Sequence, residues 1–275
     1  MSDPAASPFA NERALKRLRR RRAADRRFKW YGRMAIGFAL AALTLLLASI
    51  ATQAVSAATY HVVSFDLDFD EQTFGEAKPG DPPQVDKVYG LVRADLLAQF
   101  PETAGSRPLR HELTALITRL AVLPVARELA RKPGEVGTVR RVELPLSDDL
   151  DLYLKGANAR HLTVPIGRVE AKAADGVVTV KAEDAFNRLI AAVSLEGIQA
   201  SGAPDTGSIL MTAGRSTIKL SALGESSATG KLLTGSLQDF QTQPVRARLI
   251  PSPETERTVS DRQIAWLLAL KAEGR

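Results

Sequence analysis

The chain of 275 residues contains no cysteine, which excludes disulfides, thiolate zinc sites, iron–sulfur clusters and cysteine nucleophiles. It has only three histidines, so a histidine-rich metal site is not expected. Aromatic residues make up 5%, too few for a platform on which nucleic-acid bases stack. We therefore expect no cofactor, no metal and no nucleic-acid partner, and we assign no residue a catalytic or cofactor-binding role.

The positive charge of the chain is concentrated at its start. Residues 1–33 hold eleven Lys or Arg and three acidic residues, so this segment has a net charge of +8. The net charge of the whole chain is +6. The remainder is therefore slightly acidic. A nucleic-acid-binding domain would instead spread its basic residues over a folded face.

One apolar run follows this basic leader. Residues 34–60 contain no charged residue. Met34 to Ala54 would form a helix about 30 Å long, which is the hydrocarbon thickness of a bilayer. We predict a transmembrane helix over 34–55. The twenty residues from Ser56 to Gly75 contain no Lys or Arg, so the positive-inside rule places the N-terminus in the cytoplasm and the chain after Tyr60 outside.

Three other interpretations of this region are open. Ser56-Ala57-Ala58 could be the cleavage site of a signal peptide, although the apolar run and the basic leader are both long for one. The leader could be an arm that binds nucleic acid, although it directly adjoins the apolar run. The run could be a buried globular helix, although it is apolar on every face. A stably inserted helix accounts for the long apolar run and long leader, for their direct junction, and for the apolar residues on every face.

Residues 60–156 indicate a mixed α+β domain. In 61–70, Phe65, Leu67 and Phe69 alternate with aspartates, which predicts a strand with one buried face. Further expected elements are helices over 89–100, 108–122 and 124–131, a strand over 138–146 and a helical turn over 148–154. In the second helix, the expected apolar positions are Leu109, Leu113, Leu116, Ile117 and Leu120.

Residues 157–257 are richer in Val, Thr, Gly and Ser and predict a β-rich insertion. Asp175-Gly176 is typical of a tight hairpin turn. Other expected elements are a helix over 182–193 and strands over 208–212, 216–222, 232–237 and 245–249. The fold class is therefore α+β, with one N-terminal transmembrane helix.

Residues 258–275 predict a final helix. Ser260 and Gln263 have the spacing of a capping box, in which each side chain binds the other residue's backbone N–H. Ile264, Leu267 and Leu268 form an apolar stripe, and Gly274 suits the C-terminal cap.

Two motifs come close to a metal or phosphate site. His111-Glu112 begins a zinc-protease pattern, but Ala115 stands where the second histidine is needed, so we expect an exposed helical position. Gly224 to Lys231 resembles a phosphate loop, but the spacing is one residue too long and Leu232 replaces the magnesium-binding hydroxyl. We expect a plain turn there.

Two further groups of residues could carry chemistry. Ser216 and Lys219 have the Ser-x-x-Lys spacing of some acyl-transfer enzymes, but on a strand their side chains point to opposite faces. The acidic residues Asp66, Asp68, Asp70 and Glu71 could bind calcium, but Glu71 stands where a calcium loop needs glycine. We expect structural roles for both groups.

Several of these features in order resemble a known family. They are a leader ending Ala-Asp-Arg-Arg-Phe-Lys-Trp-Tyr-Gly32, one membrane helix, Phe65-Asp-Leu-Asp-Phe-Asp70, the helical stretch 89–131, Pro145-Leu-Ser-Asp-Asp149 with Leu154-Lys-Gly156, and Ser260-Asp-Arg-Gln-Ile-Ala-Trp266 before Ala-Glu-Gly-Arg275. The chain resembles the N-terminal extension of the PstA-type permease subunit of alphaproteobacterial phosphate ABC transporters, over roughly 11–156 and 258–275.

The resemblance implies a function and partners. It implies import of inorganic phosphate across the bacterial inner membrane, with a docking or assembly role for this periplasm-facing part. The implied partners are a second permease subunit, an ATP-binding subunit and a periplasmic phosphate-binding protein, and membrane lipids would contact the basic leader. The family's multi-helix core and its Glu-Ala-Ala…Gly coupling loop are absent from this sequence. We expect either that the natural chain continues past Arg275 or that the gene is truncated.

Two alternatives from other classes are open. The chain could be a free-standing single-pass periplasmic scaffold or interaction protein. It could also be a membrane-anchored hydrolase that uses carboxylates or Ser216 and Lys219. Because no catalytic constellation is complete, we expect that the chain is not an enzyme.

Overall fold

The computed structural model describes residues 12–75, 81–157, 159–182 and 186–275. The chain divides into two compact units, residues 1–59 and residues 60–275. The first residues of the leader, residues 76–80, residue 158 and residues 183–185 of the helix expected over 182–193 lie outside the described residues.

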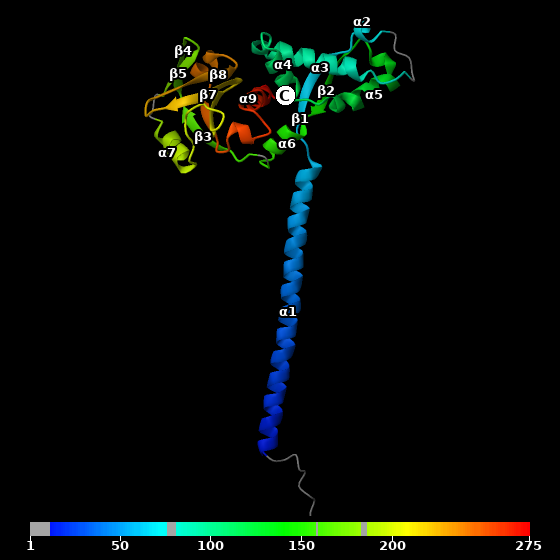
Figure 1. Ribbon diagram of the computed structural model, residues 1–275. Helices are drawn as coiled ribbons and strands as arrows, with labels where there is room; N and C mark the ends of the chain where they lie inside the picture. Colours follow the sequence, from blue (N-terminus) through cyan, green and yellow to red (C-terminus); the bar gives the residue numbers. More distant parts are fainter. Residues whose placement is uncertain (1–11, 76–80, 158, 183–185) are drawn as a thin grey trace, which may run out of the picture. The chain divides into compact units, whose positions relative to one another are not determined.

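In the described residues of the first unit, the chain forms a single long helix, α1 (Glu12–Ala58) (Figure 1). Its 47 residues correspond to about 70 Å of helix. The basic leader and the apolar run are therefore parts of one continuous helix rather than a loose arm followed by a helix. One helix in the described residues is long and apolar enough to cross a membrane, by length and composition, and it is this one.

The second unit mixes helices and strands. Its helical part contains β1 (Val62–Asp68), α2 (Glu71–Phe74), α3 (Val85–Gln99), η1 (Pro101–Thr103), α4 (Arg107–Thr114), η2 (Arg119–Val122), α5 (Leu123–Arg131), η3 (Pro133–Glu135), β2 (Val139–Pro145) and α6 (Asp148–Leu154). Its sheet part contains β3 (Leu162–Gly167), β4 (Val169–Ala174), β5 (Val177–Ala182), α7 (Asn187–Leu195), β6 (Ser208–Ala213), β7 (Ser216–Leu223), β8 (Ser227–Thr234), α8 (Leu237–Thr242), β9 (Val245–Ile250) and η4 (Glu254–Glu256). The final helix is α9 (Asp261–Ala272).

The helical part packs around the two-stranded antiparallel sheet β1–β2, in which Phe65 lies opposite Val142. Phe65, Leu67 and Phe69 are buried and the aspartates between them face outward, which confirms the two-faced strand. The α3, α4 and α5 helices and α9 complete this first core. Trp266 of α9 is fully buried, and its ring centroid lies 6.1 Å from that of Phe100.

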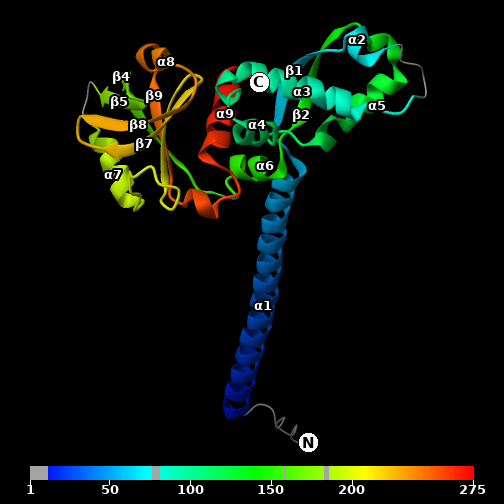
Figure 2. The same ribbon diagram turned by 45° about the horizontal axis from the view of Figure 1, so that its top comes forward.

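The seven strands of the sheet part form a curled antiparallel sheet. Their order is β3-β9-β6-β7-β8-β5-β4, so the first and last strands are consecutive in the chain and only Arg168 separates them. Two edges joined by one residue must come together at that corner, which gives the sheet a barrel-like shape (Figure 2). Its interior forms a second core, which α7 and α8 complete with Phe186, Leu189 and Phe240.

Alternation along the barrel strands explains how the two cores meet. In β6, Ile209 and Met211 point into the barrel, whereas Leu210 between them belongs to the first core. Leu233 of β8 and Ile250 of β9 likewise belong to the first core. The outer face of the barrel is therefore partly apolar, and α9 packs against it through contacts with β6, β7 and β8. The mixed α+β class predicted from the sequence agrees with this architecture.

Two local predictions are confirmed in detail. Asp175 and Gly176 have φ angles of 51° and 77°, as a type I′ turn requires, and they join β4 to β5. At the start of α9, Ser260 Oγ accepts a hydrogen bond from the Gln263 backbone N–H, and Gln263 Oε1 accepts one from the Ser260 N–H. The capping box is complete.

The helix predicted over 108–122 is wrong in its second half. The α4 helix ends at Thr114, and η2 begins only at Arg119. The carbonyl of Leu116 accepts a hydrogen bond from the backbone N–H of Ser147, at 2.9 Å, instead of continuing a helical ladder. Leu120, expected to be buried, is 76% exposed.

The strand predicted over 232–237 is also misplaced. The observed β8 begins five residues earlier, at Ser227, and ends at Thr234. Residues 237–242 form α8, because Ser236 caps a short helix by accepting a hydrogen bond from the Gln238 N–H. The first barrel strand, β3, was not expected from the sequence.

Gly230 provides a test of the barrel. It lies in β8 opposite Leu220, and a Cβ there would overlap the Lys219 carbonyl oxygen of β7. Gly230→Ala should therefore destabilise the fold by about 3 kcal/mol, because backbone must move to relieve the overlap. Urea unfolding of the full chain in detergent measures this. Gly134→Ala is the matched control, because nothing lies within 4 Å of its added Cβ. Equal midpoints for the two variants would contradict the assigned β7–β8 register.

Candidate functional site

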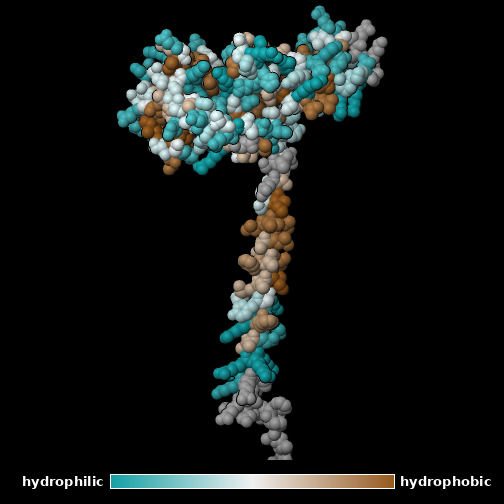
Figure 3. Space-filling view, in the orientation of Figure 1, coloured by the Kyte–Doolittle hydropathy of each residue, from teal (hydrophilic) through white to brown (hydrophobic). Residues whose placement is uncertain are grey.

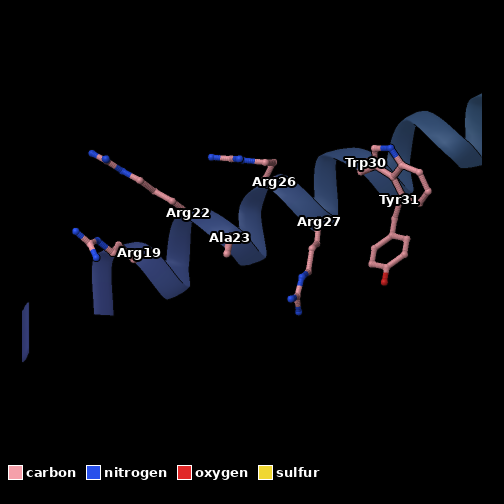
Figure 4. Close-up of a pocket in the computed structure, with 7 residues that line it drawn as sticks. All are labelled: Arg19, Arg22, Ala23, Arg26, Arg27, Trp30 and Tyr31. Atoms are coloured by element: carbon pink, nitrogen blue, oxygen red, sulfur yellow. The ribbon is translucent and has the colours of Figure 1, made fainter. Parts of the chain in front are cut away.

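The surface of α1 changes character along its length (Figure 3). From Met34 to Ile50, large apolar side chains are more than half exposed in the isolated chain, Phe38 reaching 78%. Before Met34 the same helix is basic. Arg22 and Arg26 project on one side of the helix, with Arg27 and Tyr31 on the other, and all come from α1 itself (Figure 4). The space between them is an open helix surface rather than an enclosed site.

A buried ion cluster lies where α9 meets the barrel. Asp261, at the first turn of α9, forms ion pairs with Lys219 of β7 at 2.7 Å and with Arg257 at 2.8 Å. It also accepts a hydrogen bond from Ser208 of β6 at 2.7 Å. Glu254 completes the cluster by binding Lys219 at 2.8 Å. The Asp261 and Arg257 side chains are each only 2% exposed.

The cluster controls the protonation of its members. Burial alone would raise the pKa of Asp261, but Arg257 and the hydrogen bonds from Lys219 and Ser208 more than offset it, so this pKa is lowered. Burial likewise opposes the charge of Lys219, and the two carboxylates reverse that effect and raise its pKa. Asp261 and Lys219 therefore stay ionised around neutral pH, and the cluster joins α9 to the barrel.

The second unit also carries a basic hollow of about 620 Å³ between α3 and α4. Arg93 of α3 and Arg107, Arg110 and His111 of α4 line it, and all four are exposed. Tyr89, Leu97, Thr114 and Ala115 form the rest of its wall. None of the lining residues is acidic.

Arg93, Arg110 and Tyr89 in the wall of the basic hollow make contacts that restrict their side chains. Arg110 Nη1 donates a hydrogen bond to the Ala104 carbonyl oxygen at 3.0 Å. The guanidinium of Arg93 lies 6.0 Å from the ring centroid of Tyr89, within cation–π range. The Tyr89 hydroxyl in turn donates to the Thr114 carbonyl oxygen of α4 at 3.2 Å. The positive groups are thus partly oriented before anything binds.

Sequence reasoning missed the basic hollow. The sequence indicated a concentration of positive charge only in the leader, and Arg93 is separated from Arg107 by the end of α3 and by η1. The signal that could have found it is the spacing of Arg107, Arg110 and His111, which places them on neighbouring positions of one helical face.

The motif residues have structural roles. His111 is exposed, as expected, and Glu112 accepts a hydrogen bond from Ser260 Oγ. Ser216 and Lys219 engage different partners: Ser216 donates to Asp239 at 2.5 Å, and Lys219 joins the ion cluster. The structure does not bring them together as a nucleophile and its base.

The other motifs also lack a ligand site. Gly224 and Ser227 close the turn between β7 and β8, and Gly230 and Lys231 lie in β8 rather than in a phosphate loop. Asp70 caps α2 by accepting two hydrogen bonds from Thr73, which lower the pKa of this carboxyl. Among the residues that the structure describes, no three His, Asp or Glu side chains gather closely enough to hold a metal ion.

Comparison with known families adds one relationship. The family model described as "Domain of unknown function (DUF3333)" matches residues 15–163, more than half of the chain. The chain belongs to this family. The DUF3333 match covers most of α1 and the helical part of the second unit with its basic hollow, and it ends within β3. No curated protein and no solved structure matches the chain.

Asp261 provides the test of the ion cluster. Asp261→Asn should lower the free energy of unfolding by about 3–5 kcal/mol, because it leaves Lys219 and Arg257 buried beside a neutral amide. Urea unfolding of the full chain at about pH 7 measures this. The control is Asp66→Asn on the exposed face of β1. Equal stability losses in the two variants would contradict a role for the buried pairs.

The pH dependence of stability follows from the same group. The pKa of Asp261 is lower in the folded than in the unfolded chain, so its carboxylate stabilises the fold above the unfolded value of about 3.9. That contribution disappears as the pH falls through the folded pKa. Stability measured between about pH 5 and about pH 2 should therefore fall more steeply in the wild type than in Asp261→Asn. Parallel curves would contradict the assignment.

Proposed function

We propose that the chain is the N-terminal, membrane-anchored, periplasm-facing part of a PstA-type permease subunit of a phosphate ABC transporter, which imports inorganic phosphate across the bacterial inner membrane. In this proposal the second unit docks or assembles other components of the transporter. No catalytic role is assigned to the chain.

The observation that carries the membrane part of the proposal is the exposed apolar surface of α1. Leu45 and Phe38 are 74% and 78% exposed, so nothing in the described part of the chain covers them. A helix satisfies its own backbone hydrogen bonds, so such a surface is stable in lipid and costly in water. Trp30 and Tyr31 precede the apolar run, where interfacial aromatic residues belong.

The basic half of α1 supports the proposed orientation. Eleven Lys or Arg precede the apolar run, and none lies in the twenty residues from Ser56 to Gly75. The positive-inside rule then favours a cytoplasmic N-terminus and a periplasmic second unit. Arginines continuous with the membrane helix also suit contact with anionic lipid headgroups on the cytoplasmic side.

The transporter assignment is supported by the ordered resemblance rather than by any reaction chemistry. The resemblance includes the capped helix from Ser260 to Trp266, whose residues are structural in this chain. The proposed partners are a second permease subunit, an ATP-binding subunit and a periplasmic phosphate-binding protein.

The absence of cysteine makes the orientation directly testable. In intact spheroplasts, a membrane-impermeant maleimide should label Ala173→Cys, an exposed position of β4, and should leave Ala23→Cys in the basic part of α1 unlabelled. Both variants should react after the membrane is permeabilised, which is the control for reactivity. Labelling of Ala23→Cys in intact spheroplasts would reverse the proposed topology, and recovery of the chain in the soluble fraction would reject it.

Phosphate uptake tests the transporter assignment. Deleting the gene should reduce uptake of radiolabelled phosphate by phosphate-limited cells, and the intact gene should restore it. Uptake of an unrelated amino acid is the control. Affinity purification from native membranes should recover an ATP-binding subunit together with the chain. Unchanged phosphate uptake without an ATP-binding subunit in the purified material would contradict the proposal and favour a free-standing scaffold.

A further inference from the structure

We infer that the basic hollow between α3 and α4 is a docking site for an acidic segment of a partner protein. The inference rests on the geometry of α3 and α4 and not on the transporter assignment. It names a partner chemistry for a surface that no sequence motif marked.

The first argument is the charge of the hollow. Arg93, Arg107 and Arg110 present three guanidiniums, and a guanidinium is charged at every physiological pH. A positive surface without neighbouring carboxylates attracts anionic groups and speeds their association. An exposed face that served only solubility would intersperse charges of both signs.

The second argument is where the acidic residues of this region lie. The segment from Val85 to Ala115 contains four acidic residues, and each binds a partner outside the hollow. Asp86 pairs with Arg119, Asp95 with Arg275, Glu102 with Thr234 and Trp266, and Glu112 with Ser260. Among the residues that the structure describes, no carboxylate therefore forms an ion pair with Arg93, Arg107 or Arg110.

The third argument is size and lining. A volume of about 620 Å³ corresponds to roughly 20 water molecules at ~30 Å³ each, far more than a single tetrahedral oxyanion occupies. Leu97, Ala115 and the ring of Tyr89 add apolar surface to the wall. Several carboxylates on a short polypeptide, with intervening apolar side chains, match both the charge and the extent.

The arginines are also suitably oriented for carboxylates. The hydrogen bond from Arg110 to Ala104 uses one nitrogen and leaves the other donors of that guanidinium for a ligand. The contact of Arg93 with Tyr89 limits the freedom of its side chain. Partial ordering reduces the entropy lost when a partner binds.

The experiment places a reporter in the hollow. The chain lacks cysteine, so Ala115→Cys accepts an environment-sensitive dye at one position of the wall. The full chain, reconstituted in neutral lipid nanodiscs, is titrated with a hexaglutamate peptide. We expect a saturable change of dye emission, which about 0.5 M salt should abolish because it screens exposed charges. A dye at Ala173→Cys, an exposed position of β4, controls for effects of the peptide and salt on the dye itself and should not respond.

A charge-matched pair of variants isolates the hollow. Reversing Arg93, Arg107 and Arg110 to Glu should weaken the response at Ala115→Cys by about tenfold or more. Reversing the exposed arginines Arg127, Arg131 and Arg141 changes the net charge equally and should leave the response within about twofold. Circular dichroism spectra that match the wild type establish that both variants fold.

Three outcomes would overturn the inference. They are the absence of a saturable response in the wild type, equal weakening by the two triple reversals, and a stronger response to inorganic phosphate or to anionic lipid vesicles than to the peptide. The last outcome would reassign the hollow to a small anion or a membrane surface. Because the test uses no transporter component, its result is independent of the phosphate-uptake measurement.

Discussion

The packing of the second unit depends on the ion pairs of Asp261. This carboxylate caps the dipole at the start of α9 and binds Lys219 of the barrel and Arg257 before the helix. Burying three charges carries a large desolvation cost, which only close pairing and added hydrogen bonds offset. The geometry that satisfies Asp261 is therefore restrictive. It places α9 on the outer face of the barrel in one register, and Trp266 then reaches the first core.

Pairing of charged groups also distinguishes the carboxylates of α3 and α4 from their arginines. Two carboxylates of this region bind other parts of the second unit: Glu102 accepts a hydrogen bond from Thr234 of the barrel, and Glu112 accepts one from Ser260, which caps α9. Arginines remain on the outside, because their long stems reach solvent easily. Glu102 of η1 and Glu112 of α4 thus bind other parts of the second unit, whereas Arg93, Arg107 and Arg110 stay exposed around the hollow. The hollow follows from how the fold satisfies its buried polar groups, and it is not a separate insertion.

Local patterns predicted the elements that depend on local physics. The alternation of Phe65 and its neighbours, the Asp175-Gly176 turn and the Ser260 capping box were all correct, because each involves residues within a few positions. Predictions failed where a distant group decides. Ser147 interrupts the helix after α4 through the Leu116 carbonyl, which lies 31 residues earlier in the chain. The α8 helix had a local signal in Ser236 and Asp239, which was overlooked. The basic hollow and the Asp261 cluster join residues that only the tertiary fold brings together.

The apolar helix and the basic hollow complement each other in energetic terms. An exposed cluster of a few charged groups binds weakly, because solvent and salt screen it. In the proposed membrane-anchored form, a partner held at the same membrane would encounter the site at a raised effective concentration. A weak electrostatic site then suffices for occupancy while it still allows release. The proposed membrane anchor on α1 and the proposed docking site between α3 and α4 together favour reversible docking, whereas tight binding in free solution would need a larger and more apolar interface than this hollow offers.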